Sequence, residues 1–357
     1  MEKKPEFRGG RKKNQIISLV IVGVLIFLTF YTLRKITGNL GFSYLWSVIC
    51  RLEGKYVVLA FIFMAAFVII EGQCLAILAK ALGHRATFSS ATVYAASDIY
   101  FSAITPSATG GQPASAYYMA RDGIPVSQTT TILIVNILLY TLSLVIMGLW
   151  ALAVKFRFFL HAGAILQVLF AVGMVLQLLL IALCLLCMFS QDMIRKLGHW
   201  VVGVLHRFHV IRSKEDKLEK MNASIGKYQA GVKFIKKQPL VMVSVLAGNI
   251  LMRIAFFSIG WFVYKAFGLC QMGYGEFVAL QALLAIAVNS LPIPGAIGAS
   301  EGSFLLLFQG AYPAAVLVPA MLLTRGINYY LCFVLCGIYM LIYHVCIGKR
   351  TEGEENE

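Results

Sequence analysis

Five charged side chains stand inside long apolar stretches of the sequence, and they are the first candidates for chemistry. They are Glu71, Asp98, Arg253, Glu301 and Arg325. Charged residues at membrane depth are costly, and they either line a substrate or ion path or pair with one another. Arginine suits a phosphate group because its planar guanidinium donates two hydrogen bonds at once, whereas an acid can hold that arginine or bind an amine. We therefore expect these five residues to line a path for a polar headgroup, with buried ion pairs between helices as the alternative.

Two segments rich in proline and glycine, residues 97–113 and 289–302, interrupt apolar sequence. Proline removes a backbone donor and glycine favours non-helical backbone, so a helix should not continue through either segment. At membrane depth such backbone is tolerated only inside protein or beside a water-filled cavity, and paired breaks in two halves of a chain indicate a transport site. Glycine-flanked helix starts can bind phosphate through their amides, and close helix packing is the alternative. The motif residues are Thr105, Pro106, Gly110, Gly111, Pro113, Pro292, Pro294, Gly295 and Gly298.

The elements that must position these residues are transmembrane helices. Of the 357 residues, 59% are hydrophobic and 13% are charged, against about 25% charged in a soluble domain. Several apolar blocks approach or exceed the roughly 20 residues that cross a bilayer, and the backbone within them must be helical. The block 314–347 is too long for one straight crossing, which predicts a strong tilt or a break near Arg325–Gly326. The fold class is therefore an all-α, polytopic integral membrane protein with about six to eight transmembrane helices. The other blocks are residues 16–33, 56–80, 128–154, 163–189 and 239–267.

The distribution of basic residues predicts the orientation. Residues 190–238 hold eleven Lys and Arg against four acids, and residues 1–15 are also basic. Such residues gather on the cytoplasmic side, so both segments are expected there. Residues 1–15 precede one membrane domain at 16–347, the loop 190–238 lies within that domain, and an acidic tail at 348–357 follows it. With this topology the first Pro/Gly segment enters from the cytoplasm and the second from the opposite side, as in an inverted repeat.

Other classes of function find little support in the sequence. The net charge of +15 lies in loops between apolar blocks, so no nucleic-acid partner is expected. Cys184 and Cys187 form a C-x-x-C with no second pair or nearby histidine, so neither a metal site nor a cofactor is predicted. The sequence also lacks a phosphate-binding P-loop and an embedded nucleophile–base pair, and catalysis is not expected.

The two Pro/Gly motifs resemble those of a known family. Residues 105–113, the later Gly123 and residues 292–302 are similar to the lysylphosphatidylglycerol synthase transmembrane-region family. That family includes the flippase-like half of the bacterial multiple peptide resistance factor, and the resemblance covers about residues 14–347. Ser107 and Ala296 depart from the pattern, because glycine is common at both positions.

The resemblance implies a plasma-membrane protein that moves a phospholipid, or an aminoacyl-phospholipid such as lysylphosphatidylglycerol, between leaflets. The soluble aminoacyl-transferase half of the two-part members has no counterpart in this sequence. Two alternatives stay open: a protein of the phosphatidylglycerol lysyltransferase type, and an accessory subunit of a separate lipid-modifying enzyme. The expected partner is a membrane phospholipid, and oligomers are possible.

Overall fold

The computed structural model describes residues 42–105, 108–190, 226–289, 291 and 294–354, and this part of the chain is helical without strands. Five helical stretches in it are long and apolar enough to cross a membrane. They begin and end within three residues of the predicted blocks, which confirms the all-α polytopic fold class. The predicted span 16–33 lies outside the described residues, as do residues 1–15, Pro106, Pro292 and most of 190–238. The five stretches are α3 (Gly54–Ala81), α6 (Val126–Val154), α8 (Ala164–Phe189), α11 (Pro239–Ala266) and the continuous stretch Ala314–Val345.

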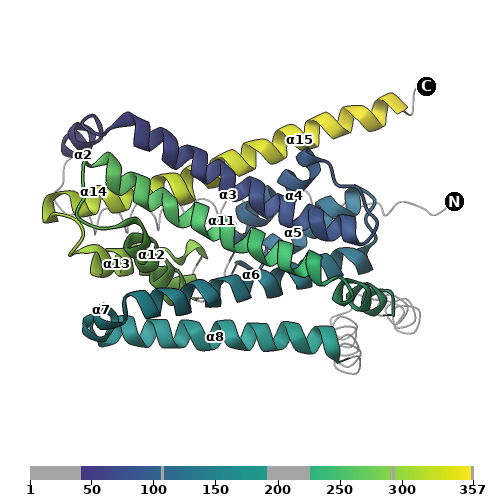
Figure 1. Ribbon diagram of the computed structural model, residues 1–357. Helices are drawn as coiled ribbons and strands as arrows, with labels where there is room; N and C mark the ends of the chain where they lie inside the picture. The colour runs from purple at the N-terminus through teal and green to yellow at the C-terminus, as the bar shows by residue number, and fades with distance from the viewer. Residues whose placement is uncertain (1–41, 106–107, 191–225, 290, 292–293, 355–357) are drawn as a thin grey trace, which may run out of the picture.

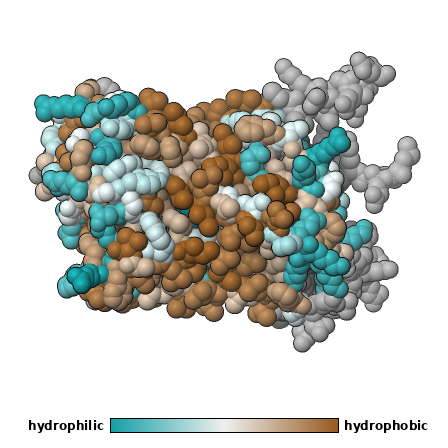
Figure 2. Space-filling model, in the orientation of Figure 1, coloured by the Kyte–Doolittle hydropathy of each residue, from teal (hydrophilic) through white to brown (hydrophobic). Residues whose placement is uncertain are grey.

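The outer surface is organised as a belt. Figure 2 shows a broad hydrophobic band between two hydrophilic ends. Along α8 the exposed side chains are large and apolar, among them Val172, Val175, Leu178 and Leu179. A soluble protein rarely exposes so much contiguous apolar surface, so this band is the face that meets lipid.

The two ends of the bundle can be told apart by their contacts. At the basic end, His84 hydrogen-bonds Gln128, and Arg121 contacts His344 of α15 (Cys332–Glu354). A helix over residues 226–236 lies at this end, where Tyr228 donates to the carbonyl of Cys187. At the far end, the amide of Glu53 donates to the carbonyl of Ala266, and Lys155 pairs with Glu276. The short helices α2 (Phe42–Ile49) and α7 (Phe156–His161) also lie at the far end (Figure 1).

Two helical hairpins enter the bundle from opposite ends, as predicted. In the first, α4 (Phe88–Ile104) runs inward from the basic end and α5 (Gly111–Arg121) returns to that end. In the second, α12 (Tyr274–Asn289) runs inward from the far end, and the chain returns through the short η2 (Pro294–Ala296) and α13 (Ala299–Phe308). Each hairpin turns at a Pro/Gly segment, because those residues cannot continue a helix.

The two hairpin tips share one backbone feature. Ala108 and Ala296 both have positive φ angles, 54° and 50°, which cost an L-residue roughly 1–2 kcal/mol. Each alanine follows a proline by two positions and precedes by two positions the N-cap glycine of the returning helix, Gly110 or Gly298. The conformation explains why glycine would suit position 296, where this chain has alanine.

The packing of the long helices also relates the two halves. In the centre, α3 packs along α11, while α4 packs against α15 and α12 packs against α6. These contacts are symmetric if α3, α4 and α6 correspond to α11, α12 and the last stretch. The contact of α4 with α15 then corresponds to the contact of α12 with α6, and the contact of α3 with α11 corresponds to itself. The arrangement agrees with the inverted repeat that the opposed Pro/Gly segments predicted.

The last stretch is neither broken nor a regular α-helix near Arg325. After α14 (Ala314–Arg325), the chain forms a π-helical turn, η3 (Gly326–Leu331), and then continues as α15 to Glu354. Thus a local widening replaces the sharp break that was one of the two expectations. Such π-turns occur often at functional sites. Arg325, Asn328 and Tyr329 all line one cavity, as residues three and four positions apart share one face of a helix.

Candidate functional site

Glu71 of α3 and Asp98 of α4 line one internal cavity of about 560 Å³, here called the acid cavity. Both side chains are buried. Asp98 accepts hydrogen bonds from Ser102 at 3.0 Å and from the side-chain amide of Gln112 at 2.6 Å. Neither Glu71 nor Asp98 makes an ion pair within the described residues. The wall is completed by residues of α6, α8 and α12 that include Asn136, Tyr140, Leu176, Gln177, Leu180 and Asn289.

Arg253 lies close to these acids but its hydrogen bonds go elsewhere. Its Nε donates to the hydroxyl of Ser143 at 2.7 Å, and its Nη2 donates to the carbonyl of Tyr140 at 2.7 Å. The guanidinium carbon also stands 4.1 Å from the centre of the Tyr140 ring. Since Tyr140 lines the acid cavity and Arg253 does not, Arg253 ties α11 to α6 and supplies a positive charge from behind that wall.

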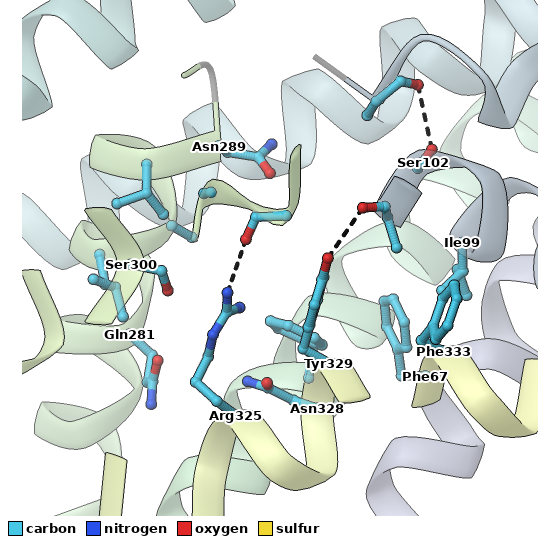
Figure 3. A pocket seen from close by; sticks show the side chains of 18 of the residues that line it. Phe67, Ile99, Ser102, Gln281, Asn289, Ser300, Arg325, Asn328, Tyr329 and Phe333 are labelled. Carbon is cyan, nitrogen blue, oxygen red and sulfur yellow. Dashed lines mark hydrogen bonds between the residues drawn. The ribbon is translucent and has the colours of Figure 1, made fainter. Parts of the chain in front are cut away.

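Arg325 lines a second cavity of about 280 Å³, here called the arginine cavity. Its Nη2 donates to the carbonyl of Gly295 at 2.8 Å, and its Nε donates to Glu301 at 2.9 Å. Figure 3 shows Arg325 and Tyr329 pointing from the last helical stretch to the backbone oxygens of Gly295 and Ala103, with Asn328 between them. The Tyr329 hydroxyl donates to the carbonyl of Ala103 at 3.0 Å, so this wall reaches from η3 to the end of α4.

Glu301 stands behind Arg325 rather than in the cavity wall. It is 3% exposed, and its second oxygen accepts the amide of Gly298 at 2.6 Å. The carboxylate therefore closes the start of α13 and holds Arg325 at the same time. This buried pair matches the ion-pair alternative for Glu301, whereas Arg325 still faces the cavity.

The two cavities adjoin each other between the hairpin tips. Five residues line both of them: Phe67, Ile99, Ser102, Ala108 and Asn289. Together the cavities join the tip of the first hairpin to the tip of the second. Among the described residues, these five form the boundary between the two cavities.

Three of the motif glycines, Gly110, Gly111 and Gly295, allow neighbouring groups to approach closely. A Cβ atom on Gly111 would overlap the side chains of Asp98 and Ser102, and one on Gly295 would overlap the ring of Tyr329. The amide of Gly110 is bound by the Thr105 hydroxyl at 2.8 Å, and that of Gly298 by Glu301. Both amides are therefore occupied, which disfavours phosphate binding there. Gly110 approaches Thr105 closely, whereas Gly298 has open space around it and a φ of 86°, a conformation that glycine adopts without strain. Pro113 lies in the first turn of α5, a position where proline is tolerated, and Pro294 begins η2.

Several site residues escaped the sequence analysis because they carry no charge. Gln112, Asn136, Gln281, Asn289, Ser300 and Asn328 all line one or both cavities. The signal that could have found them is the same as for the charges, a polar side chain inside an apolar helix. No group of three metal-binding side chains occurs within the described part of the chain.

These features define a polytopic α-helical membrane protein with opposed re-entrant hairpins around a polar interior. The chain belongs to the family described as the lysylphosphatidylglycerol synthase TM region, which it matches over residues 15–336. It is also similar to a UPF0104 membrane protein of Archaeoglobus fulgidus, with 23% identity over 320 residues, 87% of this chain and 91% of the relative. The resemblance carried by the Pro/Gly motifs is confirmed, and it relates the protein to lipid modification.

Proposed function

We propose that the protein moves a phospholipid between the two leaflets of the cell membrane, with the headgroup passing through the acid and arginine cavities. The observation that carries the proposal is the shared wall between two polar cavities at the tips of hairpins that enter from opposite ends. A headgroup crossing the bilayer needs such a polar route, because an unsatisfied polar group costs several kcal/mol in hydrocarbon.

The charges suggest which headgroup fits. Within the described residues, Nη1 of Arg325 has no hydrogen-bond partner, while Nε and Nη2 are bound by Glu301 and Gly295. Guanidinium groups suit phosphate. Glu71 and Asp98 offer carboxylates without a paired cation among the described residues, and these suit an amine. A phospholipid that bears an amine, including an aminoacyl-phospholipid, presents both groups.

The acyl chains have a route outside the protein. Leu176 and Leu180 line the acid cavity from α8, and they are 40% and 37% exposed. This side of the cavity is therefore formed by α8, the helix whose exposed side chains are part of the apolar belt. The acyl chains could therefore stay in the bilayer beside α8 and cross the membrane together with the headgroup, which would move inside the cavity.

Enlarging Ile99 is expected to block the route. Ile99→Trp places a bulky ring in the shared wall and should lower the rate of lipid transfer at least about tenfold, which corresponds to about 1.4 kcal/mol in barrier height. The measurement is leaflet exchange of acyl-chain-labelled phosphatidylethanolamine and phosphatidylglycerol in vesicles that contain the purified protein. Val172→Trp, on the exposed face of α8, is the matched control and should keep the wild-type rate. Wild-type vesicles that exchange neither lipid faster than protein-free vesicles would refute the proposal.

We further place the basic end in the cytoplasm, which native cysteines can test. Cys50 and Cys270 are exposed at the far end, so a membrane-impermeant thiol reagent should label both on intact cells. The double variant Cys50→Ser/Cys270→Ser should lose this labelling. Labelling of these two positions only after the cells are broken open would reverse the proposed orientation.

A further inference from the structure

Glu71 and Asp98 form an acid pair whose charge the surroundings do not balance. The two carboxyl groups face the same cavity, one from α3 and the other from α4. Within the described residues no lysine or arginine lies within ion-pair distance of either group. At membrane depth an unpaired carboxylate is costly, so groups of this kind mark ion paths and proton relays.

Charged and titratable groups on α3, α6, α11 and α15 surround the acid pair. Among the described residues, the one cation near the pair is Arg253 of α11, which already donates hydrogen bonds to Ser143 and to the Tyr140 carbonyl. The other facing groups are neutral or weakly acidic: Cys74 on α3, Tyr140 on α6, and Cys332 and Cys336 on α15. One cation thus faces two acids, and like carboxyl groups that share a site cannot both ionise without a further positive charge.

The hydrogen bonds decide which acid carries the charge. Ser102 and Gln112 both donate to Asp98, and donors to a carboxylate favour its ionised form. Both donors belong to the first hairpin, which packs on Asp98 through Gly111. Glu71 is therefore the member that holds a proton when the cavity contains no other cation.

We infer that Glu71 and Asp98 are a proton-binding pair that exchanges one proton for the amine of a headgroup, and so couples lipid movement to proton movement in the opposite direction. The inference rests on the proposed function. An amine that enters the acid cavity replaces the proton as the compensating charge, and the proton leaves to water on that side. When the amine departs on the other side, Glu71 takes up a proton there. Only an O–H bond forms or breaks, and protons balance over the cycle.

The proton site can be tested without transport. The infrared C=O stretching band of a buried protonated carboxyl should be present in the purified wild-type protein at neutral pH and disappear at high pH. Glu71→Gln should lack this band. In Asp98→Asn, where Arg253 faces only one acid, the band should disappear at a lower pH than in the wild-type protein. A band that survives in Glu71→Gln, or no titrating band in the wild-type protein, would overturn the assignment.

The coupling is tested in vesicles with a trace of acyl-chain-labelled phosphatidylethanolamine and an entrapped pH dye. Potassium with valinomycin holds the electrical potential at zero. For one-to-one exchange, a gradient of about one pH unit should drive about tenfold enrichment of the lipid in one leaflet. Glu71→Gln should lose this enrichment, while Glu276→Gln, which removes an exposed acid at the far end, should keep it.

The outcomes separate the coupling from the proposed function. Lipid exchange that does not respond to the pH gradient would refute the coupling but not the proposed lipid transfer. Enrichment driven by a sodium gradient at constant pH would overturn the proton as the coupling ion. A titrating Glu71 band without any lipid exchange would overturn the proposed function and the coupling together.

Discussion

Replacing Arg325 by methionine is expected to destabilise the protein by roughly 3–5 kcal/mol and to abolish lipid transfer. The loss of stability follows because Glu301, 3% exposed, would keep its charge at a buried site without its partner. Transfer would be lost because the arginine cavity would have no group for phosphate. Thermal or denaturant unfolding in detergent, together with the vesicle exchange assay, measures both effects.

A double variant separates the structural role of the pair from its functional role. Arg325→Met with Glu301→Gln removes both charges and keeps similar volumes, a change that is often neutral or stabilising for a buried ion pair. It should therefore regain most of the stability lost in the single variant, but not the transfer of lipid. A double variant that recovers both would show that Arg325 only locks α14 to α13.

Replacing Gly111 by alanine is the second change with a large expected effect. Its Cβ atom would overlap the Asp98 and Ser102 side chains and stand 2.6 Å from the carbonyl oxygen of Asp98. Overpacking of this kind costs about 1–3 kcal/mol, and here the atoms that must move include the acid of the proposed proton pair. We expect lower stability in the unfolding assay and loss of the pH-driven lipid enrichment.

Gly302→Ala is the matched control for this change. Gly302 also lies near the start of a returning hairpin helix, but a Cβ atom there would have no atom within 4 Å. Alanine is favoured over glycine in a helix by up to about 1 kcal/mol, so this variant should be as stable as the wild type or slightly more stable. Equal losses in both variants would mean that flexibility, rather than the close approach to Asp98, explains the glycine at position 111.

The positions of the helices followed from the sequence because the bilayer leaves few choices. A long apolar block must be helical at membrane depth, so the bounds of α3, α6, α8 and α11 could be predicted within three residues. Proline and glycine act locally on the backbone, so the turning points of both hairpins could be predicted as well. The opposite directions of the hairpins were predicted from the basic segments and the number of crossings between them.

The partners of the charged residues were decided by the tertiary structure. The sequence marked five charges as one set, but packing divides them: Arg253 binds α6, Glu301 binds Arg325, and Glu71 shares a cavity with Asp98. These contacts join helices that are far apart along the chain, and their distances depend on how α3, α4 and α11 cross. The π-turn after Arg325 and uncharged wall residues such as Asn289 depend on the same packing. The sequence by itself therefore determined which residues lie in the membrane and where the helices turn, while only the tertiary structure determined which polar groups meet.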